Sequence, residues 1–294
     1  MIKKLFLPAI ILAGMLFMAG CTDTSAQPLY EYRLISSVEV DGRQGVCSEG
    51  DYFWVSGSAS LAKYDREWNL VALNDDPFKG YTIEVNHIAD IDVYENELYI
   101  GAEYFDGAAG KNIQIAVYDG DTLELKRTFP FEKKSGQEEC SGIAVDGETG
   151  TVWMCSWVGE ESGRYLYKYD LESGEYLGRT ELKDPPMWVQ GVACYNGNLF
   201  LTADDGNAGM DRPDHLYRLS ADPEADTAEV YMERTFDDVK MQGEIEGLTF
   251  DEKEKRLLLL YNRGARISAG VPEGFYDGYK REISEVFTYD IEEQ

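Results

Sequence analysis

The fold is decided by the stretch Ser141-Gly142-Ile143-Ala144-Val145-Asp146-Gly147-Glu148-Thr149-Gly150-Thr151-Val152-Trp153-Met154. A polar residue precedes an alternating apolar strand, a polar turn follows, and a second strand rich in β-branched and aromatic residues returns. The same phrase occurs five times between Gln44 and Tyr289. The other copies begin Gln44-Gly45-Val46-Cys47, Ala89-Asp90-Ile91-Asp92-Val93, Gln190-Gly191-Val192-Ala193-Cys194 and Glu246-Gly247-Leu248-Thr249-Phe250. Such repetition predicts an array of similar structural units.

Each copy continues into further strand patterns. Second strands are expected at 52–55, 98–100, 152–154, 199–201 and 257–260. Third strands are expected at 61–64, 115–118, 166–169, 216–219 and 286–291, and several end in Tyr-Asp before a tight turn. Fourth strands are expected at 70–73, 125–129, 176–182 and 229–235. A repeat of roughly 45–55 residues with about four strands is typical of a propeller blade.

We therefore predict an all-β chain that forms a single β-propeller of five four-stranded blades, with six blades as the alternative. No fourth strand follows Ile291, whereas the strand pattern at 32–40 precedes the first blade and has no partner there. We expect this N-terminal strand to complete the last blade, because closure removes an open edge that would invite pairing with other chains.

Composition agrees with one large domain and restricts its partners. The chain has 294 residues, of which 44% are hydrophobic, and its formal net charge is −28. No basic run longer than a pair occurs after the N-terminus, so the sequence argues against nucleic acid as a partner, since phosphate backbones need clustered Lys and Arg. The acidity is typical of a well-solvated outer surface.

The N-terminus predicts export. Lys3 and Lys4 precede the apolar run 5–17, which ends in Met18-Ala19-Gly20-Cys21. A basic start, a short apolar run and small residues form a signal peptide. The ending also resembles the lipobox of bacterial lipoproteins, which implies a lipid on Cys21 and a protein anchored to a membrane of the bacterial cell envelope. We expect a signal peptide at 1–20, a polar tether at 21–29 and the propeller at 30–294, with ordinary secretion as the alternative.

The remaining cysteines are Cys47, Cys140, Cys155 and Cys194, and none forms a CxxC motif. We expect buried thiols. A disulfide between Cys140 and Cys155 within blade three is the alternative that an exported protein permits.

The unusual polar residues gather where loops lead into the inner strands and leave the second strands. In a propeller these loops open on one face, around a central mouth. Those leading in include Gln44, His87, Asp90, Glu139, Ser141, Trp188, Gln190, Glu244 and Glu246, and those leaving include Glu103, Ser156, Trp157, Asp204, Asp205, Tyr261, Asn262, Arg263 and Arg266. The mouth is therefore the candidate binding site.

Five oxygen-bearing residues could form a ring on the axis: Gln44, Asp90, Ser141, Gln190 and Glu246. A set of this kind suits a divalent cation, above all Ca²⁺, which takes about six to eight oxygen ligands. Two carboxylates across a narrow channel would otherwise repel one another and raise a pKa. The alternative is that these groups and ordered water satisfy each other.

Two histidines and two arginines supply the other candidate chemistry. His87 and His215 could act as a general base or a metal ligand, or could be structural. Arg263 and Arg266 could hold a carboxylate or phosphate, or pair with nearby carboxylates. The run 204–207 is a weak Ca²⁺ signal. The aromatic loop 274–279 is either a lid over the mouth or packing for a long crossover.

The Glu246-Gly247-Leu248 start, together with Tyr-Asp hairpins and Gly-rich first turns, resembles the metal-containing lactonase, strictosidine-synthase-like and NHL-type propellers. The five-unit count is also similar to calcium-activated nucleotidases. The lactonase resemblance implies that Glu246 is a metal ligand and that Asp90 or Gln190 is another. The chain departs from that group because it lacks a clear Asn pair at the corresponding strand ends.

Three functions remain open from the sequence. The first is metal-dependent hydrolysis of esters, lactones or phosphate esters, with His87 and Glu246 in acid–base or ligand roles and Arg263 or Arg266 fixing an anionic group. The second is a binding module for a sugar or other small polar ligand, on platforms formed by Trp157, Trp188 and Tyr261, with Glu103, Asp204, Asp205, His215 and Asn262 as further contacts. The third is a scaffold for a partner protein.

Overall fold

The computed structural model describes residues 27–107, 110–130, 132–157 and 161–294. The expected lipidation site Cys21, the expected signal peptide and most of the expected tether lie outside these residues. Among the described residues, no helix is long and apolar enough to cross a membrane.

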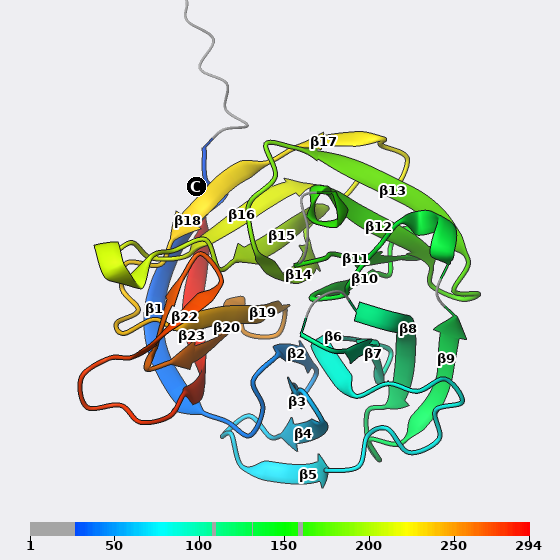
Figure 1. Ribbon diagram of the computed structural model, residues 1–294, viewed down its shortest axis with the longest axis horizontal. Helices are drawn as coiled ribbons and strands as arrows, with labels where there is room; N and C mark the ends of the chain where they lie inside the picture. Colours follow the sequence, from blue (N-terminus) through cyan, green and yellow to red (C-terminus); the bar gives the residue numbers. More distant parts are fainter. Residues whose placement is uncertain (1–26, 108–109, 131, 158–160) are drawn as a thin grey trace, which may run out of the picture.

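Five sheets surround a central axis as the blades of a propeller (Figure 1). Blade one holds β2 (Gly45–Glu49), β3 (Tyr52–Gly57), β4 (Ser60–Tyr64) and β5 (Leu70–Asn74), and blade two holds β6 (His87–Tyr94), β7 (Glu97–Phe105), β8 (Gly110–Asp119) and β9 (Leu125–Pro130). Blade three holds β10 (Ile143–Asp146), β11 (Thr151–Met154), β12 (Tyr165–Asp170) and β13 (Tyr176–Lys183). Blade four holds β14 (Val189–Tyr195), β15 (Asn198–Ala203), β16 (His215–Ser220) and β18 (Tyr231–Thr235). Blade five holds β19 (Glu244–Asp251), β20 (Arg256–Arg263), β23 (Ile283–Glu293) and β1 (Tyr30–Glu39).

The ring is closed by its N-terminal strand, as the sequence predicts. β1 pairs antiparallel with β23, so that Tyr30 lies opposite Glu293 and Glu39 lies opposite Glu285 (Figure 1). Five blades are present rather than six. The start of β1 thus lies at the end of blade five that is remote from the mouth, because β23 begins beside Arg263 at the mouth and runs away from it.

Blades three and five depart from the expected pattern. The strand expected at 229–235 is two strands: β17 (Thr227–Glu229) pairs in parallel with β13 of blade three, and only β18 belongs to blade four. The amide of Glu181 donates to the carbonyl of Asp226 at 2.8 Å, so this segment is fixed to blade three before it crosses. Blade five carries an inserted hairpin, β21 (Ala265–Ser268) and β22 (Val271–Phe275), between β20 and β23.

The repeated Tyr-Asp pair has two structural roles. Tyr118 and Tyr169 are buried between blades, and they bury aromatic surface while leaving their hydroxyls near polar partners. Asp119 and Asp170 accept backbone hydrogen bonds from the turns that follow. Asp119 accepts the Asp121 amide at 3.1 Å, as in an Asx turn, and Asp170 accepts the Ser173 amide at 2.7 Å. The pair therefore both fills the space between blades and shapes the turn.

Three short 3-10 helices occur among the described residues, at Lys133–Ser135, Ser162–Arg164 and Ala208–Met210. The four cysteines in this part of the chain are free thiols. Cys140 and Cys155 are buried but do not form the disulfide that the sequence left open.

Candidate functional site at the axial mouth

The axis itself is filled by Asp90, whose side chain is fully buried. One carboxylate oxygen accepts the Ile91 amide at 2.8 Å and the other accepts the Val192 amide of blade four at 3.3 Å. Gly45 and Gly247 make the space for it, because a Cβ on either residue would overlap this carboxylate. Asp90 therefore connects the inner strand of blade two with that of blade four across the axis and does not face the mouth.

This placement corrects the ring that the sequence suggests. Gln44, Ser141, Gln190 and Glu246 each precede a glycine, whereas Asp90 occupies the position of that glycine in blade two. A one-residue offset in a strand turns a side chain to the other direction. The first four residues consequently line the mouth, while Asp90 lies below it on the axis.

A cavity of about 240 Å³ opens at the mouth. Its lining comes from loops of all five blades and from the inserted hairpin: Arg43, Gln44, His87, Phe105, Glu139, Ser141, Trp157, Gln190, Glu244, Glu246 and Gly270. We call this the axial pocket. It confirms the expectation that these loops converge on one face.

A hydrogen-bonded chain forms the floor of the axial pocket. The Gln44 carboxamide oxygen faces His87 Nε2 at 2.8 Å, and its nitrogen donates to Glu246 Oε1 at 3.3 Å. Asn262, which is fully buried, donates to the same Glu246 oxygen at 2.6 Å. The Gln44 side chain thus links His87 to Glu246. Asn262 holds Glu246 by a hydrogen bond and does not line the axial pocket.

Glu246 is the buried acid of this floor. Burial raises its pKa well above the ordinary value, and the neighbouring Glu244 carboxylate raises it further, while Arg43 opposes both effects. The Arg43 Nη2 atom lies 2.9 Å from Glu244, 3.2 Å from Glu282 and 3.8 Å from Glu246. The cationic side chain is therefore surrounded by carboxylates.

His87 also approaches a fully buried carboxylate on its other side. Its Nδ1 atom is 3.5 Å from Glu103 Oε1, and neither atom has a hydrogen-bond partner among the described residues. The second Glu103 oxygen accepts the Cys140 amide at 3.1 Å. Glu103 thus lies behind His87 without a hydrogen bond to it, and it does not line the pocket.

Aromatic residues and the hairpin form one wall. The Trp157 and Trp188 rings pack with centroids 4.8 Å apart, and Trp157 lines the pocket. Gly270, at the hairpin tip, lies against both indoles and has a φ of +72° that disfavours a side chain. The cover over the mouth is therefore this tip, and the aromatic loop expected as a lid lies beyond it. Gly274 and Phe275 of that loop belong to β22.

The remaining polar residues of the floor satisfy one another. Gln190 donates to Glu244 at 2.9 Å, and Ser141 donates to the Val189 carbonyl at 2.8 Å. Among the described residues, no three His, Cys, Asp or Glu side chains come together as a metal site. The hydrogen bonds of the floor agree with the alternative of mutual satisfaction, and a Ca²⁺ ion held by the Gln44, Ser141, Gln190 and Glu246 oxygens stays a prediction.

Several sequence candidates lie away from the axial pocket. Tyr261 is completely buried in the core, so it offers no platform to a ligand. Asp205 accepts hydrogen bonds from Tyr217 at 2.6 Å and faces His215 Nδ1 at 2.8 Å, which gives this histidine a structural partner. Asp204 is buried near that pair.

The two arginines do not reach the axial pocket either. Arg263 forms an ion pair with Glu285 at 2.5 Å, and Arg266 lies 3.8 Å from Glu273. Pairing with carboxylates was the expected alternative, although the partners differ from those considered. The cation at the mouth is Arg43, which sequence reasoning missed. The available signal was that Arg43 is charged, whereas the four other copies have an apolar residue or Cys at the same position: Ile88, Cys140, Val189 and Ile245.

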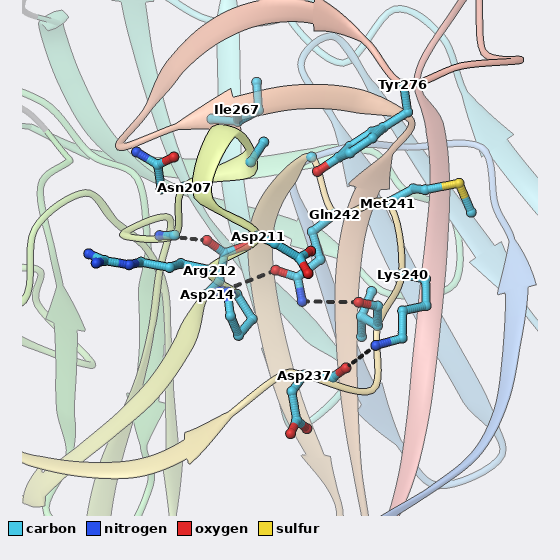
Figure 2. Close-up of a pocket in the computed structure, with 15 residues that line it drawn as sticks. Asn207, Asp211, Arg212, Asp214, Asp237, Lys240, Met241, Gln242, Ile267 and Tyr276 are labelled. Carbon is cyan, nitrogen blue, oxygen red and sulfur yellow. Dashed lines mark hydrogen bonds between the residues drawn. The ribbon is translucent and has the colours of Figure 1, made fainter.

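A second cavity, of about 320 Å³, lies on the same face between blades four and five (Figure 2). It is lined by the loop before β16, the loop before β19 and the inserted hairpin, including Asn207, Asp211, Arg212, Asp214, Asp237, Lys240, Met241, Gln242, Ile267 and Tyr276. We call this the lateral pocket. Sequence reasoning placed Asp204, Asp205 and His215 nearby but did not find Asp214.

No protein-family model and no curated protein matches the chain. A solved protein of unknown function from Bacteroides thetaiotaomicron has 10% identity and a TM-score of 0.53, with 91% of this chain and 74% of that chain covered. The PQQ-bound aldose sugar dehydrogenase from Streptomyces coelicolor has 10% identity and a TM-score of 0.47, with 91% and 100% covered. A gluconolactonase from Xanthomonas campestris has 12% identity and a TM-score of 0.47, with 82% and 68% covered.

The likeness to the Bacteroides thetaiotaomicron protein shows the fold alone. Propellers carry binding modules and enzymes alike, so function has to be argued from the site.

Proposed function

We propose that the axial pocket binds a small neutral ligand rich in hydroxyl groups, of the size of one sugar ring. The observation that carries this proposal is the combination, in one pocket, of carboxylates and carboxamides with the Trp157 indole. Hydroxyl groups need both donors and acceptors, and the apolar face of a sugar ring packs on an aromatic side chain. The volume of about 240 Å³ is just below the roughly 300–1,000 Å³ that is usual for drug-sized ligands, so the ligand is small.

The charge of the pocket argues against the anionic ligand that the sequence suggests. Arg43 is matched by three carboxylates, and Arg263 and Arg266 pair elsewhere. Glu139 and Glu244 also line the pocket. A carboxylate or phosphate would meet this negative charge, and the described part of the chain offers no unpaired cation in the pocket lining to balance it.

Binding should depend on the indole wall. We expect a neutral monosaccharide to bind the wild-type protein and the affinity to fall at least tenfold in Trp157→Ala, or about 1.4 kcal/mol, because the stacking surface is lost. Isothermal titration calorimetry with a panel of neutral, phosphorylated and amino sugars measures this.

Phe275→Ala is the matched control, since Phe275 is an exposed aromatic residue of the same hairpin outside the axial pocket. It should bind as the wild type does. If only the phosphorylated sugars of the panel bind, the proposal of a neutral ligand is wrong and the anionic ligand expected from the sequence is favoured.

A second candidate is acid–base hydrolysis in the same pocket, favoured by the raised pKa of Glu246. A carboxyl group that keeps its proton near neutral pH can act as a general acid. Gln44 links it to His87, which could accept a proton. Glu246→Gln separates the two functions: turnover is lost if Glu246 is the acid, whereas binding of a neutral sugar survives.

We also propose that the protein is exported and anchored through a lipid on Cys21. The described chain begins at the end of blade five remote from the mouth, where the Arg218 guanidinium donates to the Gln27 carbonyl at 2.6 Å. An anchor that precedes this point would hold the axial pocket away from the membrane surface.

The anchor predicts a fractionation result. In a bacterium that expresses the full chain, Cys21→Ser should abolish labelling by radioactive palmitate and move the protein from the membrane to the soluble fraction. Cys194→Ser, which alters a half-buried thiol of β14, should leave both unchanged. A Cys21→Ser protein that stays in the membrane would contradict lipidation.

A further inference from the structure

The lateral pocket contains a buried acid that lacks a partner. Asp214 lines the cavity and is only 2% exposed. Its Oδ1 atom accepts the Gly206 amide at 2.9 Å, but Oδ2 has no hydrogen-bond partner among the described residues. A buried unpaired carboxylate oxygen costs about 1–3 kcal/mol or more, so it calls for an explanation.

The groups around Asp214 are acidic. Asp204 and Asp205 follow β15, and Glu244 begins β19. In addition to burial, the Asp205 and Glu244 carboxylates raise the pKa of both Asp214 and Asp204, and Asp214 raises that of Asp204. The Tyr261 hydroxyl of β20 faces the Asp214 carboxyl and, as a neighbouring donor, lowers its pKa. His215 is engaged by Asp205 and does not neutralise Asp214.

Three cationic side chains lie at or beside the lateral pocket, and none forms an ion pair with Asp214. Figure 2 shows the Arg212 guanidinium extending away from Gln242 and Tyr276. Lys240 Nζ donates to the Asp237 carbonyl at 2.5 Å, and the Arg266 guanidinium, outside the lining, lies over one face of the Tyr276 ring, 6.0 Å from its centroid. The interior thus offers a carboxyl group and an aromatic ring without an ion-pair partner for Asp214 among the described residues.

We propose that the lateral pocket binds a small organic cation, a primary ammonium or a guanidinium, with Asp214 as its counter-charge and the Tyr276 ring as an aromatic wall. Carboxylate and aromatic faces together attract such cations, more strongly where water is excluded. The volume of about 320 Å³ holds a short alkyl chain beside the charged group, against Ile267 and Val239. This site is separate from the axial pocket and does not depend on the function proposed for it.

Protonation supports the same ligand class. Burial raises the pKa of Asp214 well above its ordinary value, and the Asp205 and Glu244 carboxylates raise it further, whereas the Gly206 amide lowers it. Burial also raises the pKa of Asp204 well above its ordinary value, and the Asp214 carboxylate raises it further. A raised pKa favours the protonated form of this pair, so a bound cation should lower the pKa and release a proton to solvent.

The test uses n-butylammonium chloride as the probe and n-butanol as its neutral isostere, titrated calorimetrically into the full chain in two buffers of different ionisation enthalpy. We expect saturable binding of butylammonium only, with proton release visible as a buffer-dependent heat. Asp214→Asn, which preserves size and an acceptor for Gly206, should weaken binding at least tenfold. The matched control Asp184→Asn changes an exposed aspartate on the same face and should bind as the wild type does.

Two outcomes would overturn the proposal. One is equal binding of butylammonium and n-butanol, and the other is no saturable heat with butylammonium in wild-type protein that circular dichroism shows to be folded. Trp157→Ala should leave butylammonium binding unchanged. The two proposals can therefore fail independently: sugar binding tests the axial pocket, and butylammonium binding tests the lateral pocket.

Discussion

Glu233→Ala should lower the free energy of unfolding by about 3–5 kcal/mol, the range found when one partner of a buried ion pair is removed. Glu233 is fully buried beside Arg218, with Oε2 2.7 Å from Nε. It also accepts the Leu29 amide at 2.9 Å and the Tyr30 amide at 3.1 Å. The side chain therefore fixes the first residues of β1 to blade four, and its loss leaves both amides and the guanidinium without this acceptor.

Urea unfolding measures the change, and amide hydrogen exchange shows where it occurs. Protection should fall first in β1, because the closing strand loses its attachment. Glu233→Gln keeps one acceptor oxygen and should lose less stability than Glu233→Ala. Glu229→Ala removes an exposed carboxylate of β17 and should be close to neutral. Unchanged exchange in β1 of Glu233→Ala would show that strand pairing alone closes the ring.

Asp90→Ala should have the second large effect, a loss of about 2–5 kcal/mol, because it leaves buried backbone amides unpaired and a cavity on the axis. The Ile91 and Val192 amides lose their acceptors in this variant. Asp90→Asn retains volume and one acceptor oxygen, so it should lose less than half as much. Urea unfolding of both variants measures the difference.

Asp90 also predicts how stability varies with pH. Burial raises its pKa well above the ordinary value, so the folded chain keeps a proton that the unfolded chain releases above about pH 4. This contribution is complete below the unfolded pKa and is lost as pH rises through the folded pKa. Burial likewise raises the pKa of Asp92 to about 7, which adds to the same trend between about pH 4 and pH 7.

The decline in stability above pH 4 should therefore be shallower in Asp90→Asn than in the wild type. Unfolding free energies at several pH values between 4 and 8 test this. Equal slopes would mean that Asp90 is ionised in the folded protein, held by its backbone donors.

The local sequence pattern was enough to predict the blades, because alternating apolar residues indicate each strand and Gly, Asn or Asp indicates each turn. The pairing of the N-terminal strand with β23 also followed, since an unpaired strand and an incomplete blade occur at opposite ends of the chain. The sequence did not predict that the strand pattern near Glu229 is divided between two blades. Thr227–Glu229 and Tyr231–Thr235 have the pattern of one continuous strand, and only their different partners separate them.

The sequence predicted which loops surround the site, but not the contacts that their side chains make. Eight of the axial-pocket residues stand at the inner-strand starts or second-strand ends that the architecture brings together: Gln44, His87, Glu139, Ser141, Trp157, Gln190, Glu244 and Glu246. Arg43, Phe105 and Gly270 were missed, and Gly270 reaches the pocket only because the hairpin folds back over blade four.

The sequence by itself determined the propeller, its five blades and its closure, because repeat spacing and side-chain alternation are properties of neighbouring residues. Only the tertiary structure decided what each polar residue does. The direction of a side chain at the axis depends on a single residue of register, which turns Asp90 into the central plug and leaves Glu246 at the mouth. Charge balance depends on partners far along the chain, so that Arg43 meets Glu244 and Glu282 about two hundred residues later.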